Sequence, residues 1–156
     1  MLAQTRKAIG GSAPPDKPAA TGNSPQSGKK SAPATILVVD DEPLIRWAVR
    51  ETLTDRGYEV IEAGDAASAI GAISPSGDAV DVVLLDVRLP DSADLHLLSA
   101  MCRLSSRASV ILMTAHSSPE LFVEAHRLGA FAVVDKPFEM DALPPLIEHA
   151  LAARPH

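Results

Sequence analysis

Short, continuous apolar runs separated by longer stretches of helical character constrain the fold of this chain more than any other feature. Five runs follow one another: Ile36–Val39, Glu59–Ile61, Val80–Leu85, Val110–Met113 and Phe131–Val134. Because most of them are continuously apolar and do not alternate with polar residues, they predict strands that are buried on both faces, as in a parallel sheet covered by helices. Successive parallel strands also need a long crossover connection, and the intervals between the runs provide one.

The intervals between the runs predict helices, and several carry boundary signals. The predicted helices are Leu44–Arg56, Ala66–Ile73, Leu95–Leu104, Pro119–Leu128 and a last one within Asp141–Ala153. Gly57 ends the first, while Ser118 is a suitable N-cap for the fourth. Five strands that alternate with five helices predict an α/β domain with a doubly wound parallel sheet.

The first 34 residues differ in composition from the rest. Residues 1–34 lack aromatic residues and are rich in Pro, Gly, Ser and Ala, a composition that cannot bury enough apolar surface to offset chain entropy. We therefore predict a disordered tail over 1–34 and one folded domain over 35–153. The tail is either solvated filler or a weakly basic arm that contacts a partner or the acidic domain.

Charge and composition exclude several classes of protein. The chain has 14 basic and 20 acidic residues, and five basic residues and one acid fall in 1–34, which leaves the remainder with a net charge of -10. An acidic domain of this kind is unsuited to direct nucleic-acid binding. The single cysteine, Cys102, excludes a disulfide framework. Without a long apolar run or a secretory leader, the sequence predicts a cytoplasmic protein with no membrane insertion.

Polar side chains follow four of the predicted strands. Asp40 and Asp41 come after the first strand, Asp86 after the third, Thr114 after the fourth and Lys136 after the fifth. In an open α/β sheet, ligands bind beyond the carboxyl ends of the strands. We expect these five residues to converge on one site, because the combination is far more specific than any single member.

The residue types at these strand ends predict phosphoryl chemistry. Three converging carboxylates repel one another, and Mg²⁺ is the hard cation that suits such a site. Asp86 would then be a nucleophile, and Lys136 and the Thr114 hydroxyl would hold the oxygens of its phosphoryl product.

Four segments resemble the motifs of two-component response-regulator receiver domains. They are VVDDEP (38–43), LLDVRLP (84–90), MTAH (113–116) and DKPF (135–138). Glu42–Val49 and Thr114–His116 are most similar to receivers of the NtrC type. The resemblance implies a CheY-like, flavodoxin-like (βα)5 fold with strand order 2-1-3-4-5.

The resemblance also implies roles for individual residues. Asp86 would be the phosphoacceptor, with Mg²⁺ held by Asp41, Asp86, the backbone carbonyl of Arg88 and, through water, Asp40. Lys136 would contact the phosphoryl group next to a cis Lys136–Pro137 bond, and Thr114 would be the switch hydroxyl. The donor would be a sensor histidine kinase or a histidine phosphotransferase. Output would pass to a downstream protein or to self-association through the face formed by the fourth helix, fifth strand and fifth helix.

Several residues differ from those usual in the family or would affect how fast the phosphoryl group is lost. Arg88 and His116 flank the expected hydrolytic water and are bulky, which favours slow loss of phosphate, although His116 could instead orient that water. Val133 stands where receivers usually have an aromatic residue, so coupling to the output face is either altered or depends on backbone movement near Thr114. Asp94 replaces a usual glycine, and either strains its loop or caps the next helix.

Two further sequence features concern a pair of prolines in the last helix and a tryptophan in the first. Pro144 and Pro145 fall where the last helix should run, so that helix starts late or begins kinked, with Asp141 as a possible N-cap. Trp47 is either packed or partly exposed, or it contacts a kinase.

The predicted function is therefore a phosphorylation-controlled signalling switch rather than a metabolic enzyme, although it would catalyse its own phosphorylation and dephosphorylation. Because no further module is recognisable before His156, we expect a single-domain regulator or a phosphorelay intermediate. Two alternatives stand beside it. A hydrolase with an aspartyl-phosphate intermediate would need a second Asp where Arg88 stands, and a pseudo-receiver would not need the complete set of site residues.

Overall fold

The computed structural model describes residues 32–73, 79–92 and 94–153. All but the last three residues of the predicted tail lie outside this part of the chain. Contacts divide the chain at Pro33, and residues 34–156 form the second unit, to which the following description applies. No helix among the described residues is both long enough and apolar enough to cross a membrane.

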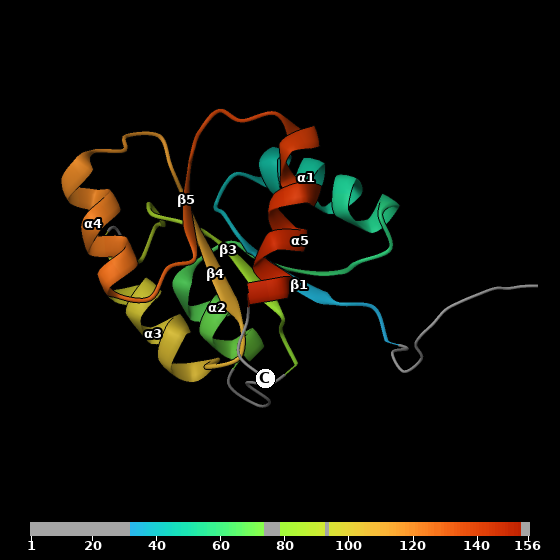
Figure 1. The fold of residues 1–156 in the computed structure, drawn as a ribbon, viewed down its shortest axis with the longest axis horizontal. Coiled ribbons are helices and arrows are strands. Elements are labelled where there is room, and N and C mark those ends of the chain that lie inside the picture. Colours follow the sequence, from blue (N-terminus) through green and yellow to red (C-terminus); the bar gives the residue numbers. More distant parts are fainter. Residues whose placement is uncertain (1–31, 74–78, 93, 154–156) are drawn as a thin grey trace, which may run out of the picture. The chain divides into compact units, whose positions relative to one another are not determined.

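Within the described residues, five strands form one parallel sheet (Figure 1). They are β1 (Thr35–Val39), β2 (Glu59–Ala63), β3 (Val82–Asp86), β4 (Ser109–Thr114) and β5 (Ala132–Asp135). The strand order is β2-β1-β3-β4-β5, and all four pairings are parallel. The predicted fold class and strand order are confirmed.

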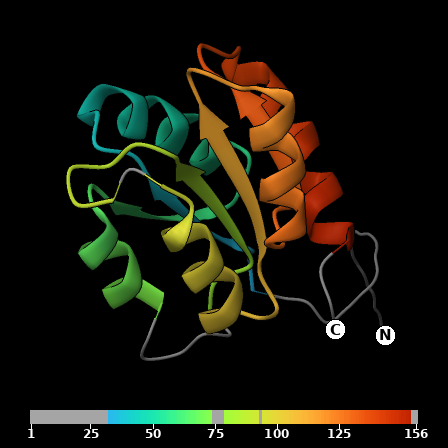
Figure 2. The same ribbon diagram turned by 90° about the vertical axis from the view of Figure 1, so that its left-hand side faces the viewer.

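Helices connect the strands and cover both faces of the sheet. They are α1 (Pro43–Asp55), α2 (Ala66–Ile73), α3 (His96–Leu104), α4 (Pro119–Arg127) and α5 (Leu143–Ala153), with a 3-10 helix η3 (Met140–Ala142) before α5. One buried cluster joins α2, α3 and α4 to the sheet, and another joins α1 and α5 to its opposite face. In Figure 1, α2, α3 and α4 lie on one side of the sheet and α1 and α5 on the other, and Figure 2 shows the domain from the side of α2, α3 and α4.

Burial on both faces explains the continuous apolar runs. All five residues of β3 are buried, yet neighbouring residues belong to different cores. Val83 and Leu85 pack in the cluster with α2, α3 and α4, whereas Val82 and Leu84 pack in the cluster with α1 and α5. Because successive side chains point to opposite faces of a strand, a strand with a core on each side needs apolar residues at every position.

The start of α5 resolves the question of the paired prolines. The 3-10 helix η3 covers Met140–Ala142, and α5 begins at Leu143. Asp141 therefore lies inside η3 and is not the N-cap of α5. Pro144 and Pro145 occupy the second and third positions of α5, where a backbone amide has no intrahelical acceptor. Of the two expected alternatives, a late start and a kinked start, the structure shows the late start.

The ends of α4 follow the predicted signals. Ser118 is the N-cap, and its hydroxyl accepts a hydrogen bond of 3.0 Å from the Leu121 amide. Pro119 fills the first helical position, where proline is preorganised. Gly129 follows the helix with a φ of 114°, a conformation that favours glycine.

Candidate phosphoacceptor site

The polar residues predicted at the strand ends meet at one edge of the sheet. Asp86 and Thr114 are the last residues of β3 and β4, while Asp40 and Lys136 directly follow β1 and β5. Because all of these strands run in the same direction, their carboxyl ends lie together. A cavity of about 600 Å³ opens here, and its lining includes Asp41, Asp86, Arg88, Thr114 and Lys136.

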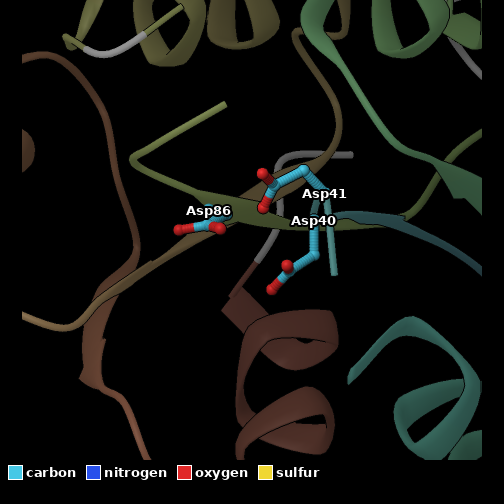
Figure 3. A group of neighbouring side chains, drawn as sticks. All are labelled: Asp40, Asp41 and Asp86. Carbon is cyan, nitrogen blue, oxygen red and sulfur yellow. The ribbon is translucent and has the colours of Figure 1, made fainter. Parts of the chain in front are cut away.

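Three carboxylates form the floor of this site (Figure 3). One carboxylate oxygen each from Asp40, Asp41 and Asp86 lies within 4.8 Å of the other two. Asp40 is fully buried and Asp86 nearly so, while Asp41 is exposed. Clustered carboxylate oxygens are the hard ligands that Mg²⁺ prefers, so this donor set fits a divalent cation.

The surroundings of Asp86 disfavour its charged form. Burial, and to a lesser degree the negative charge of Asp40, raise the pKa of Asp86 above its ordinary value. The positive charge of Lys136 and a hydrogen bond of 3.3 Å from the Arg88 amide act in the opposite direction. A cation bound among the carboxylates would relieve the same repulsion.

Lys136 supplies the positive charge of the site. Its Nζ donates to Asp40 Oδ2 at 2.8 Å, Glu42 Oε1 at 3.2 Å and Asp86 Oδ2 at 3.3 Å. Burial by itself lowers the pKa of Lys136, but the hydrogen bond to Asp40 and the charges of Asp40 and Asp86 raise it above its ordinary value. The side chain therefore remains an ammonium group at neutral pH. The Lys136–Pro137 bond is cis, as expected.

Thr114 lies at the cavity with its hydroxyl directed into the turn after β4. Its Oγ1 accepts a 3.0 Å hydrogen bond from the His116 amide, and its carbonyl accepts a 2.7 Å hydrogen bond from the Lys136 amide. These bonds join the ends of β4 and β5 beside the carboxylates. A movement of the Thr114 hydroxyl would therefore alter the conformation of the turn that leads to α4.

Comparison with known proteins assigns the chain to a family. The sequence matches the response regulator receiver domain family over residues 36–148. The chain belongs to this family. Over 74% of its length it is similar to the regulatory protein AtoC of Escherichia coli (37% identity) and to the transcriptional regulator NtrC of Proteus hauseri (36%). It spans 25% and 24% of those proteins. The predicted resemblance to NtrC-type receivers is confirmed.

Solved structures agree with this assignment. The receiver domain of NtrX from Brucella abortus is 38% identical with a TM-score of 0.68, covering 76% of this chain and 98% of that one. A CheY-like receiver from Methanospirillum hungatei has a TM-score of 0.72 at 29% identity, covering 77% of this chain and 94% of that one.

The residues expected to tune the receiver are not all brought to the cavity. Arg88 lines it. His116 and Val133 are not among the residues that line this cavity. Val133 instead lines a separate hollow of about 430 Å³ with Phe122 and Val123 of α4, and it is packed against the core.

Two contacts of the receiver site were not predicted from the sequence. Glu42 pairs with Lys136, and Arg46 Nη1 donates to the backbone carbonyl of Asp40 at 2.6 Å. Glu42 and Arg46 follow Asp40 and Asp41 at the start of α1, and their charge was the only available signal. Their partners depend on how α1 leaves the sheet, which spacing alone does not determine.

The structure also shows the surroundings of Asp94 and Trp47. The Asp94 carboxylate accepts a 3.0 Å hydrogen bond from the His96 amide at the start of α3, in agreement with a capping role. The Trp47 side chain is exposed (58%), and its contact with a kinase stays a prediction.

Proposed function

We propose that the receiver domain accepts a phosphoryl group on Asp86 by Mg²⁺-dependent transfer from the phosphohistidine of a sensor histidine kinase or a histidine phosphotransferase. One observation carries the proposal above all. Asp86 Oδ2 lies 3.3 Å from the Lys136 ammonium, beside two further carboxylates and at the wall of an open cavity.

The proposed transfer is a simple displacement at phosphorus. An Asp86 carboxylate oxygen forms a bond to phosphorus as the phosphorus–nitrogen bond to the donor imidazole breaks, and the electron pair of that bond remains on the imidazole nitrogen. Lys136 stabilises the charge that collects on the phosphoryl oxygens. The Thr114 hydroxyl, which lines the same cavity, would donate a hydrogen bond to one of them.

We propose that Mg²⁺ is held by Asp41, Asp86 and the Arg88 backbone carbonyl, with Asp40 acting through water. When bound, the ion supplies positive charge that offsets the carboxylates and the incoming phosphoryl group. Glu42, which now pairs with Lys136, would have to release the ammonium for the phosphoryl group.

The proposed output is a change at the turn after β4. If the Thr114 hydroxyl turns toward a phosphoryl oxygen, its hydrogen bond from the His116 amide is lost. That turn leads to α4, which exposes Phe122 and Val123. We propose that the α4–β5–α5 face then binds a downstream protein or a second copy of the chain. Because the donor phosphohistidine is made from ATP, we place the protein in the cytoplasm.

A small phosphodonor provides the direct test. The full chain is incubated with acetyl phosphate and Mg²⁺, and its intact mass and oligomeric state are measured beside those of Asp86→Asn. We expect one added phosphoryl group on the wild type, none on the variant and none after chelation of Mg²⁺. An unmodified wild type would overturn the proposal, and equal modification of Asp86→Asn would assign the phosphoryl group to another residue.

A further inference from the structure

We propose that Arg46 is a positioning residue that fixes the Asp40–Asp41 peptide and thereby turns Asp41 toward Asp86. This inference rests on the proposed function, because it concerns the carboxylates that would hold Mg²⁺. Arg46 itself would touch neither the ion nor the phosphoryl group, since it is not among the residues that line the cavity.

The Arg46 guanidinium joins three elements at one point. It extends from the first turn of α1, and its Nη1 donates to the Asp40 carbonyl oxygen at 2.6 Å. Its Nε donates to Glu62 Oε1 of β2 at 3.2 Å. The side chain is only 21% exposed, so these charge-assisted bonds are partly shielded from water and hold the segment firmly.

The shape of the neighbouring turn accommodates this side chain. Gly64 follows β2, and a Cβ atom at Gly64 would lie 3.1 Å from Arg46 Nη1. That distance is tighter than ordinary van der Waals contact, so the absence of a side chain at Gly64 leaves room for the guanidinium. Arg46 and Gly64 thus fit together beside the acidic segment.

The other polar groups of Asp40 are already held, which leaves its carbonyl to decide the peptide plane. The Asp40 amide donates to the Ala63 carbonyl at 3.0 Å. Its carboxylate accepts from the Glu42 amide at 2.9 Å and from Lys136 at 2.8 Å. Because the peptide is planar, the direction of the Asp40 carbonyl also sets the direction of the Asp41 amide. Without Arg46, this carbonyl would be free to rotate toward water and Asp41 would lose its fixed direction.

Arg50 provides a matched control one helical turn later. Its Nη1 lies 3.4 Å from Oε2 of the same Glu62, but its side chain is 55% exposed. Replacing Arg50 removes the same unit of charge and a bond to the same carboxylate. An effect specific to the Asp40 carbonyl should therefore appear with Arg46 and not with Arg50.

The experiment measures Mg²⁺ binding by calorimetry on the unphosphorylated full chain, together with amide hydrogen exchange at Asp41 and Glu42 without metal. We expect Arg46→Ala to weaken Mg²⁺ binding about 10-fold, the usual size for a residue that orients a metal ligand. Exchange at the two amides should become faster. Arg46→Lys should restore part of both effects because an ammonium lacks the planar fork of arginine, and Arg50→Ala should change neither.

Phosphorylation by acetyl phosphate separates positioning from loss of structure. In Arg46→Ala, a higher Mg²⁺ concentration should restore the wild-type rate, whereas partial unfolding would lower the rate at every Mg²⁺ concentration. Equal Mg²⁺ affinity and equal exchange in Arg46→Ala and the wild type would overturn the inference, as would an equal effect of Arg50→Ala. If the wild type bound no Mg²⁺, the proposed function would fail, while the exchange data would still decide whether Arg46 fixes the peptide.

Discussion

At the scale of single residues, the site is built around a charge conflict. Asp86 lies buried beside Asp40, and burial together with that neighbouring charge raises its pKa. Lys136 compensates in part, but one ammonium shared among Asp40, Glu42 and Asp86 cannot neutralise them all. The metal-free domain therefore carries a destabilising carboxylate at the position that the proposed chemistry needs most.

This conflict predicts that Asp86→Asn stabilises the metal-free domain. The amide keeps the shape of the side chain but removes a charge that burial and Asp40 disfavour. We expect the free energy of unfolding to rise by about 1 kcal/mol, the usual size of a single-residue effect. Adding Mg²⁺ should stabilise the wild type more than the variant. Urea titrations with and without Mg²⁺ would check this, and a less stable variant in chelator would contradict it.

Arg88 and His116 should differ in their effect on the lifetime of the phosphorylated state. Arg88 lines the cavity where a hydrolytic water would approach phosphorus, whereas His116 is not among its lining residues. We expect Arg88→Asn to lose its phosphoryl group severalfold faster than the wild type because the smaller side chain admits water, and His116→Ala to change less. Time courses of intact mass after removal of the donor measure both rates. A half-life of Arg88→Asn as long as that of the wild type would rule out crowding.

At the scale of elements, α2 depends on a residue from a distant loop. Its first amides need acceptors from outside the helix. Asp65 accepts from the Ser68 amide at 2.8 Å. Asp91, in the loop after β3, accepts from the Ala66 amide at 2.8 Å and the Ala67 amide at 3.1 Å. The start of α2 and the loop that follows β3 therefore hold each other in place.

Removing this shared cap should weaken both elements. We expect Asp91→Ala to lower the free energy of unfolding by about 1–2 kcal/mol, in the range of other lost helix caps, because two amides lose their acceptor. Asp91→Asn should retain part of the stability through its remaining carbonyl oxygen. Chemical denaturation of the three proteins would measure this, and unchanged stability in Asp91→Ala would show that water replaces the carboxylate without loss.

At the scale of the whole domain, the central strands contribute side chains to both hydrophobic cores. Leu84 and Leu85 are adjacent in β3, yet each packs in a different cluster. We expect Leu84→Ala and Leu85→Ala each to cost about 2–5 kcal/mol. Each should shift one common transition, seen alike by Trp47 fluorescence and by far-ultraviolet circular dichroism. Separate midpoints for the two signals would show that the two helical layers unfold independently.

The sequence predicted the sheet, its strand order and the convergence of Asp40, Asp41, Asp86, Thr114 and Lys136. The sheet and the convergence follow from local patterns, since burial on two faces produces continuous apolar runs and parallel strands end at one edge. The strand order was implied by the resemblance to receiver domains. Boundaries were less certain. Strand β3 begins at Val82 and not at Val80 as predicted. The apolar pattern does not predict that the Asp81 carboxylate, just before β3, accepts a hydrogen bond from the Thr35 amide.

Contacts that charged side chains make with groups on other elements were the least predictable. Arg46 reaches Glu62, Asp91 reaches Ala66, and Glu42 reaches Lys136. Each pair depends on the relative placement of elements that are far apart in the chain. A charged residue on an exposed turn has several possible partners, and only the packed sheet selects one of them.

The position of β5 in the chain has a consequence during synthesis of the protein on the ribosome. Among the strands of the described residues it is the last in chain order, it lies at the edge of the sheet, and Lys136 directly follows it. A nascent chain that has completed β1 to β4 already possesses Asp86 and its neighbouring carboxylates but lacks their ammonium counterion. Such a fragment would be poorly suited to hold a phosphoryl group. Under the proposed function, a growing chain would therefore acquire its complete acceptor site only after β5 and Lys136 have been made.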